Sequence, residues 1–217
     1  MKHAIKVEEA AALVPDGATV LIGGFMGVGS PHRMIDALVA RGARDLTIVA
    51  NDTAAPGNGI GKLITAGAVR KAIVSHIGLN PETQQKMMSG ELEVELVPQG
   101  TLVERIRAAG VGLGGVLTAT GIGTLVEEGK RIVEIDGARY LLETPIHGDV
   151  ALIAARQADY VGNLEYSLTA HNFNPIMAMA ATTVIAEPHL IVPVGVISPD
   201  AVKTPGILVD HLLERAA

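Results

Sequence analysis

The 217-residue chain is long enough for one large domain or two small ones, and its 48% hydrophobic content is sufficient for a substantial core. The formal net charge of −6 argues against nucleic acid or an anionic membrane as a partner. The sequence contains no cysteine, which excludes disulfides, thiolate metal sites and cysteine nucleophiles. Residues 1–12 lack the pattern of a secretory leader, so we expect a cytoplasmic location.

The chain opens with a helix pattern over 7–14, which a Pro-Asp-Gly turn ends. An apolar strand at Thr19–Ile22 then runs into a loop with four glycines. After it, Ser30 suits a helix N-cap and Pro31 the first helical position. The stretch predicts a strand, a glycine loop and a helix start, an arrangement that accommodates anions.

The same unit recurs along the next sixty residues. We expect Thr101 to cap the last helix of this series in a capping box with Glu104. The expected strands and helices are strands at 46–50, 72–75 and 92–97, and helices at 63–66, 81–88 and from 101 onward.

Alternating strands and helices predict an α/β fold with an open, mostly parallel sheet flanked by helices. The carboxyl ends of parallel strands meet at one edge of a sheet, where ligands bind. We therefore expect four strand ends to face one crevice: Gly23-Gly24, Asn51-Asp52, Ser75-His76 and Pro98-Gln99.

The second half of the chain follows another pattern. Ala108–Val126 carries no charge and is about as long as a membrane span of roughly 20 residues, but its many glycines and threonines favour a loop. Asp136-Gly137 between apolar runs predicts a β-hairpin embellishment. We expect a strand at 150–154, a helix at 175–181, a strand at 183–186 and an irregular, proline-rich end. No segment resembles a linker, so residues 1–217 read as a single domain.

The glycine loop matches neither common nucleotide motif. Gly27 and Gly29 have dinucleotide spacing, but His32 stands where the third glycine belongs. Gly24 and Gly29 have P-loop spacing, but Ser30-Pro31 replaces the lysine and hydroxyl residue. Asp52 lies where a ribose-binding acid could stand, which leaves a nucleotide cofactor as a weak alternative.

No nucleophile motif and no pair of histidines at metal-ligand spacing occurs in the chain. His76, at a strand end, is either a structural histidine or part of a site. Gln99 lies between Pro98 and Gly100, at a strand end and a helix start. Its amide is either an ordinary turn residue or a donor to an oxyanion.

Several long motifs together resemble the α subunits of family I CoA-transferases, most nearly those specific for acetate and acetoacetate. They begin with a run from Asp16 to Pro31 that contains Gly23-Gly24-Phe25. They continue at Ala50–Thr53, Ser75–Gly78, Val97–Thr101, Thr118–Thr124, Gly162–Leu164, Asn172–Pro175 and Thr204–Gly206.

This resemblance implies an open α/β fold shared with certain sugar-phosphate isomerases. It implies a β-subunit partner, in an αβ or α₂β₂ assembly, that carries the nucleophilic glutamate in a Ser-Glu-Asn-Gly motif missing from this chain. It also implies ping-pong transfer of CoA between a short-chain acyl-CoA and a free carboxylic acid, with CoA as substrate and with no metal or other cofactor.

Residue by residue, the resemblance places oxyanion stabilisation on Gln99 and CoA near the glycine loop. We take Asn51 and His76, at neighbouring strand ends, as further candidates for substrate binding. The loop candidates are Gly23, Gly24, Phe25, Met26, Gly27, Val28 and Gly29.

Three other interpretations stay open at this point. The chain could act on 3-oxoadipate or succinyl-CoA and a 3-ketoacid instead of acetate. It could be a non-enzymatic module that senses a small anion. An isomerase activity rests on fold analogy alone.

Overall fold

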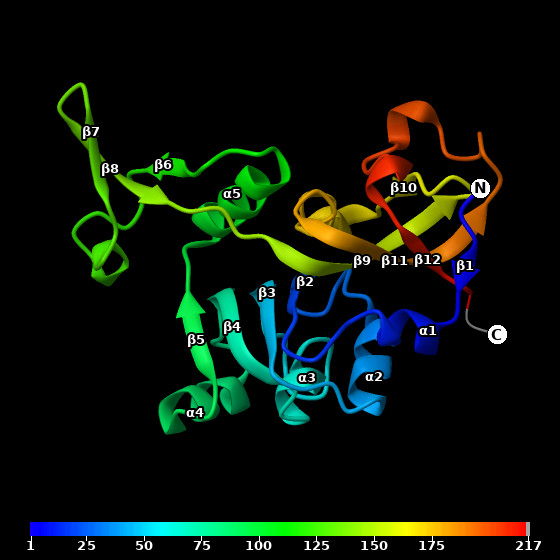
Figure 1. The fold of residues 1–217 in the computed structure, drawn as a ribbon, viewed down its shortest axis with the longest axis horizontal. Coiled ribbons are helices and arrows are strands. Elements are labelled where there is room, and N and C mark those ends of the chain that lie inside the picture. The colour runs from blue at the N-terminus through cyan, green and yellow to red at the C-terminus, as the bar shows by residue number, and fades with distance from the viewer. Residues whose placement is uncertain (216–217) are drawn as a thin grey trace.

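The computed structural model describes residues 1–215 (Figure 1). The helices are α1 Val7–Ala12, α2 His32–Ala40, α3 Gly61–Thr65, α4 Pro81–Ser89, α5 Gln99–Gly110 and α6 Asn174–Met177. The strands are β1 Ala4–Ile5, β2 Thr19–Ile22, β3 Leu46–Asp52, β4 Val69–His76, β5 Glu93–Leu96, β6 Val116–Thr118, β7 Ile132–Ile135, β8 Ala138–Glu143, β9 Gly148–Asp159, β10 Leu164–Glu165, β11 Ala181–Val192 and β12 His211–Leu213.

The main sheet has the order β1-β12-β11-β9-β2-β3-β4-β5, and all strands along this path are parallel. The chain runs outward from β2 to β5 and then returns to the other side of β2 through β9. The order therefore reverses between β2 and β9, where Val20 pairs with Val150. The predicted open, mostly parallel α/β sheet is confirmed.

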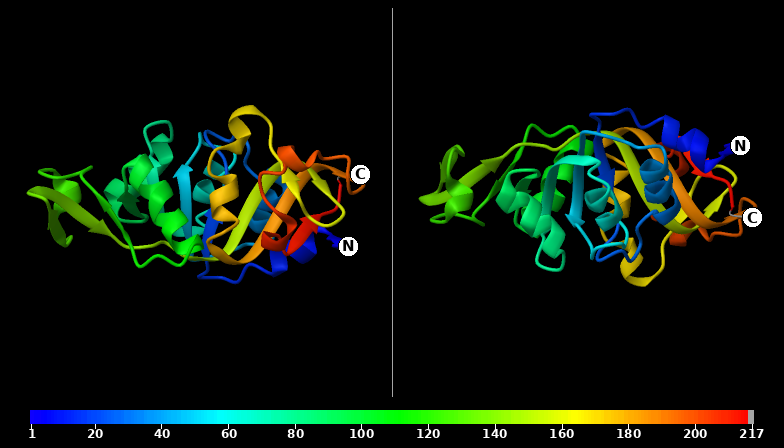
Figure 2. Two further views of the ribbon diagram at one scale, coloured as in Figure 1. Left: turned by 90° about the horizontal axis from the view of Figure 1, so that it is seen from above. Right: turned by 90° about the horizontal axis from the view of Figure 1, so that it is seen from below.

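Helices cover both faces of this sheet, as Figures 1 and 2 show. On one face α1, α2 and α3 pack through Ala10, Met34, Leu38 and Leu63 against strand residues such as Ile48. On the other face α5 and α6 bury Leu102, Ile106 and Met177. β3 is buried along its whole length, which explains its continuous apolar pattern.

Strands β3, β4, β9 and β11 are longer than predicted. β11 continues through Pro188 to Val192, where we expected irregular structure. It pairs with β12 only at Ile185 and Ala186, so beyond that point one of its edges is free. A proline lacks an N–H donor and is tolerated at such an edge.

The predicted caps of two helices are wrong. α2 begins after Pro31, and no cap bond comes from Ser30; the Arg33 and Met34 amides instead donate to the carboxylate of Glu187 on β11. α5 begins two residues before Thr101, whose buried hydroxyl has no partner in the described structure. The predicted helix at 81–88 is confirmed as α4, and Asn80 caps it, since its side chain accepts from the Thr83 amide.

A second, antiparallel sheet of order β6-β8-β7 stands apart from the main body, and we call it the arm (Figure 1). The predicted hairpin is confirmed: Asp136 and Gly137 have φ angles of 51° and 78°, as the turn requires. Glu143, at the base of the arm, is 2% exposed and bonds Lys130 at 2.5 Å. Its other oxygen lies 3.8 Å from Arg105 on α5, and this ionic contact joins the arm to the body.

Acid should loosen this junction at Glu95 on β5. Burial alone raises the pKa of Glu95, but hydrogen bonds from Arg105 and Lys71 outweigh it and lower the pKa. A lowered pKa stabilises the fold above the unfolded-state value, and that contribution is lost as the pH falls through the folded-state value. Urea unfolding from pH 7 to pH 3 should therefore show a smaller loss of stability in Glu95→Gln than in the parent.

Within residues 1–215, no helix combines the length and apolarity needed to cross a membrane. The uncharged segment 108–126 instead forms the end of α5, a turn, β6 and a loop.

Candidate functional site

Three of the predicted strand ends meet at the side chain of Asn51. Its carboxamide oxygen accepts from Nε2 of Gln99 at 2.8 Å and from Oγ of Ser75 at 2.8 Å. Asn51 ends β3, Ser75 lies near the end of β4, and Gln99 follows β5. The expectation that these strand ends face one crevice is confirmed for this trio.

Asn51 and Gln99 of this trio border a hollow of about 500 Å³, which we call the Gln99 hollow. Phe25, Asn51, Gln99, Gly100 and Val103 form one wall. The opposite wall comes from the segment after β10, through Leu168, Thr169, His171, Asn172 and Phe173. Sequence reasoning did not select this second wall, although the Asn172–Pro175 motif was a signal for it.

Hydrogen-bond donors remain available here. Asn51 is 3% exposed. Its side-chain oxygen accepts from Ser75 and Gln99, so its NH₂ group points away from these two residues. Gln99 uses one of its two amide hydrogens on Asn51 and keeps the other. Gln99 also begins α5, where backbone N–H groups and the helix dipole favour negative charge. The arrangement suits a ligand oxygen that acquires negative charge.

We expect Ser75 to affect catalysis only by holding the Asn51 side chain, which in turn orients Gln99. We expect Ser75→Ala to lower kcat by about twofold to tenfold, the worth of one hydrogen bond, with KM unchanged. Ser75→Thr keeps the hydroxyl and should restore kcat. Steady-state kinetics of the chain together with its expected β-subunit partner checks both; a change in KM alone would contradict a positioning role.

The glycine loop has two sides. Phe25 borders the Gln99 hollow, whereas Gly27, Val28 and Gly29 border a separate hollow of about 640 Å³ that also contains Arg33 and Arg156. Gly23 and Gly24, at the start of the loop, are buried. The loop thus separates two hollows instead of lining one.

Asp52 anchors this loop. Its carboxylate accepts from the Met26 amide at 2.9 Å and from the Ala54 amide at 2.7 Å. Asp52 is 5% exposed, so both oxygens serve the backbone and a ribose contact is not its role. The side chains of Phe25, Met26 and Val28 are left 41%, 44% and 53% exposed.

Asn174, at the start of α6, holds the loop from below. Its Oδ1 accepts from the Ala154 amide at 3.1 Å, and its Nδ2 donates to the carbonyls of Gly29 and Ala170. A Cβ on Gly23 would lie 1.8 Å from Oδ1 of Asn174. A Cβ on Gly29, whose φ is +75°, would lie 2.7 Å from Cα of Ala170. These glycines therefore serve close packing within the protein.

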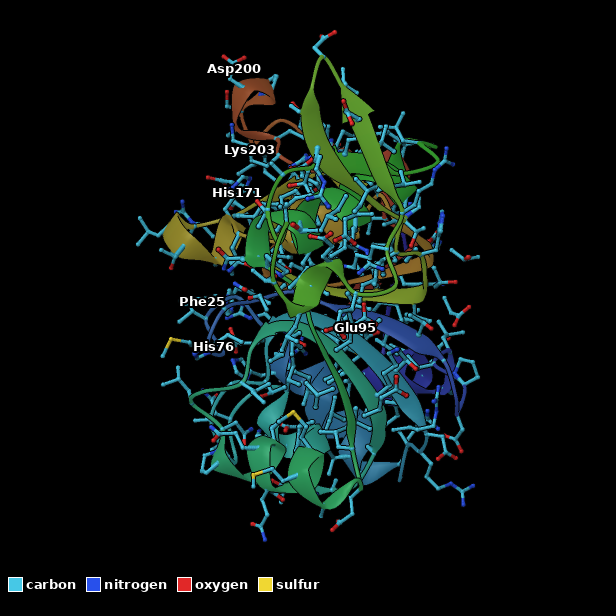
Figure 3. All side chains as sticks on the ribbon, turned by 90° about the vertical axis from the view of Figure 1, so that its left-hand side faces the viewer. Phe25, His76, Glu95, His171, Asp200 and Lys203 are labelled. Atoms are coloured by element: carbon cyan, nitrogen blue, oxygen red, sulfur yellow. The ribbon has the colours of Figure 1, made fainter. Side chains whose placement is uncertain are left out.

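His76 is exposed and does not border the Gln99 hollow. Its ring lies over Gly78, where an added Cβ would come within 2.7 Å of Nε2. Figure 3 shows His76 toward the same side of the molecule as Phe25 and His171. The structure thus brings together Gln99, Asn51 and Phe25, and places His76 at their periphery.

Comparison with known proteins identifies the class. Residues 4–215 match the family model described as coenzyme A transferase. The chain is 53% identical over 207 residues to the acetate CoA-transferase subunit alpha of Escherichia coli K12, covering 95% of this chain and 94% of that protein. It is 50% identical to the acetoacetyl-CoA:acetate/butyrate CoA transferase alpha subunit of Clostridium acetobutylicum, covering 98% of each.

A solved structure agrees with this. The acyl-CoA transferase of Escherichia coli O157:H7, in its thioester complex with CoA, superposes with a TM-score of 0.88 at 25% identity. The match covers 98% of this chain and 47% of that one, so this chain spans about half the length of that enzyme. The chain belongs to the coenzyme A transferase family. Within that family its similarity lies with the α subunits.

Proposed function

We propose that this chain is the α subunit of a heteromeric CoA-transferase that moves CoA between a short-chain acyl-CoA and a free carboxylate. The observation that carries the proposal is the Gln99 amide, oriented by Asn51 and Ser75 at the edge of a hollow. Relatives named as acetate and acetoacetyl-CoA:acetate/butyrate alpha subunits support short acyl groups.

The nucleophile in this proposal is a glutamate of a β subunit. Its carboxylate attacks the acyl-CoA carbonyl and the C–S bond breaks. The products are a mixed anhydride of the acyl group with the glutamate and the free CoA thiolate. The thiolate then attacks the glutamyl carbonyl, which releases the first carboxylic acid and forms a glutamyl-CoA thioester. In the second half-reaction the acceptor carboxylate attacks the glutamyl-CoA thioester, which releases CoA thiolate and forms a new mixed anhydride. The thiolate then attacks the acceptor's acyl carbon, which releases the new acyl-CoA and restores the glutamate. Covalent catalysis thus divides one difficult transfer into easier steps.

Each carbonyl addition creates an oxyanion, and the free N–H of Gln99 is our candidate donor to it. Asn51 holds the Gln99 amide in place. The exposed side chains of Phe25, Met26 and Val28 offer an apolar surface where the β subunit and the pantetheine arm of CoA would meet this chain. We propose an α₂β₂ assembly. His76 is exposed and does not border the Gln99 hollow, so we propose no contact between it and the reacting groups.

Co-expression with a β-type subunit tests the proposal. The pair should purify together with the mass of an α₂β₂ assembly, and it should transfer CoA from acetoacetyl-CoA to acetate. Succinyl-CoA with acetoacetate, assayed in parallel, decides between the acetate and 3-ketoacid specificities. A chain that forms no complex and binds small anions alone would instead support a sensing module.

A further inference from the structure

We propose that Gly100 is a specificity residue that opens the Gln99 hollow into a second hollow, where the uncharged tail of a longer acyl group is held. This inference rests on the proposed transferase function. The second hollow measures about 480 Å³ and lies between α5 and β6 of the arm. We call it the tail hollow. It is bordered by Gly100, Thr101, Glu104, Leu117 and Thr118, among others.

Helix geometry places Gly100 at the meeting point of the two hollows. Gln99 and Val103, four residues apart, share the face of α5 that borders the Gln99 hollow. Thr101 and Glu104, three residues apart, share the face that borders the tail hollow. Gly100 lies between these faces and borders both hollows.

The backbone does not explain why a glycine stands here. Gly100 lies in the first turn of α5 and has no positive φ, so any L-residue could adopt its conformation. A glycine this near a helix start also costs stability relative to alanine. A Cβ at Gly100 would meet no heavy atom within 4 Å. Gly100 is exposed, and the missing side chain therefore leaves open, solvent-accessible space beside both hollows.

The walls of the tail hollow suit a chain without a terminal charge. Val116 and Leu117 of β6 border the hollow, and the apolar side chain of Leu117 is 40% exposed. The residues that border the hollow include no cation to pair with the second carboxylate of an acyl group such as succinyl, and the one charged residue, Glu104, is already paired with Arg107 at 3.1 Å. Arg105 of α5 contacts the Glu143 carboxylate at 3.8 Å and the Thr144 carbonyl at 2.8 Å, which keeps the arm, and hence β6, over α5.

The test uses the assembled enzyme with Gly100→Leu, which fills the passage from α5. We expect the ratio of kcat/KM for hexanoyl-CoA to that for acetyl-CoA to fall about tenfold or more, since a misfit of one or two methylenes costs at least that much. Leu117→Trp fills the tail hollow from the opposite wall and should lower the same ratio, so a folding defect at α5 cannot hide the effect. Gly114→Leu is the matched control, because Gly114 is exposed and also has open space at its Cβ.

The outcomes separate the two proposals. If the parent complex transfers CoA to no acid, the transferase function itself is wrong. If it transfers CoA but the hexanoyl-to-acetyl ratio of Gly100→Leu and of Leu117→Trp equals that of Gly114→Leu, the tail hollow holds no acyl chain. If both variants selectively lower the use of succinyl-CoA, the occupant is a charged acyl group, and the inference is overturned.

Discussion

Replacing Gln99 by alanine should lower kcat of the assembled enzyme by about two orders of magnitude, the usual cost of removing one oxyanion donor. The donor acts on charge that develops during the reaction, so kcat and kcat/KM should fall together. Binding of the β subunit should persist, because Gln99 contributes one hydrogen bond to Asn51 and borders a hollow.

Gln85→Ala is the matched control, since Gln85 lies exposed on α4. It should leave kcat within experimental error of the parent. Gln99→Glu keeps the size of the side chain but replaces the N–H donor by an acceptor, and it should be at least as inactive as Gln99→Ala. Full turnover in either Gln99 variant would remove this residue from the chemistry.

The largest loss of stability should come from Asn174→Ala. Asn174 is fully buried and satisfies the Ala154 amide and the carbonyls of Gly29 and Ala170. A buried backbone group left without a partner costs about 1–3 kcal/mol. The bond to the Ala154 amide is buried and the two bonds to the carbonyls are partly buried, so we expect a loss of about 2–3 kcal/mol in the free energy of unfolding. Urea denaturation of the purified chain measures it.

The control for this prediction is Asn58→Ala. Asn58 contacts the same loop through the Met26 carbonyl at 3.4 Å, but it is exposed. Water replaces its hydrogen bond, so its loss should stay within about 0.5 kcal/mol. Equal losses in the two variants would show that the loop does not depend on the amide below it.

The parallel half of the fold was predictable because local signals agree there. β3 reads as an apolar run because both of its faces are buried, and Gly90 ends α4 with a φ of 78°. The Asp136-Gly137 hairpin was predictable because its turn requires those residue types. The trio at Asn51 followed from the rule that parallel strand ends meet.

Contacts between distant residues were not predictable. The amides that begin α2 are satisfied by Glu187, more than 150 residues further along, so Ser30 is not needed as a cap. The packing of Asn174 beneath Gly23 explains a glycine that we had read as serving a ligand. The division of the loop between two hollows likewise depends on the segment after β10, which local patterns do not place.

Glu187 also occupies a position where an anion could bind. The positive end of α2 is neutralised by a carboxylate of the protein itself, 3.2 Å and 3.0 Å from the Arg33 and Met34 amides. Arg33 lies 3.5 Å from the same carboxylate and is held by it. Removing this one acid would release two amides and a guanidinium together. The Glu187 carboxylate therefore stands where a helix N-terminus would otherwise bind a phosphate or another anion.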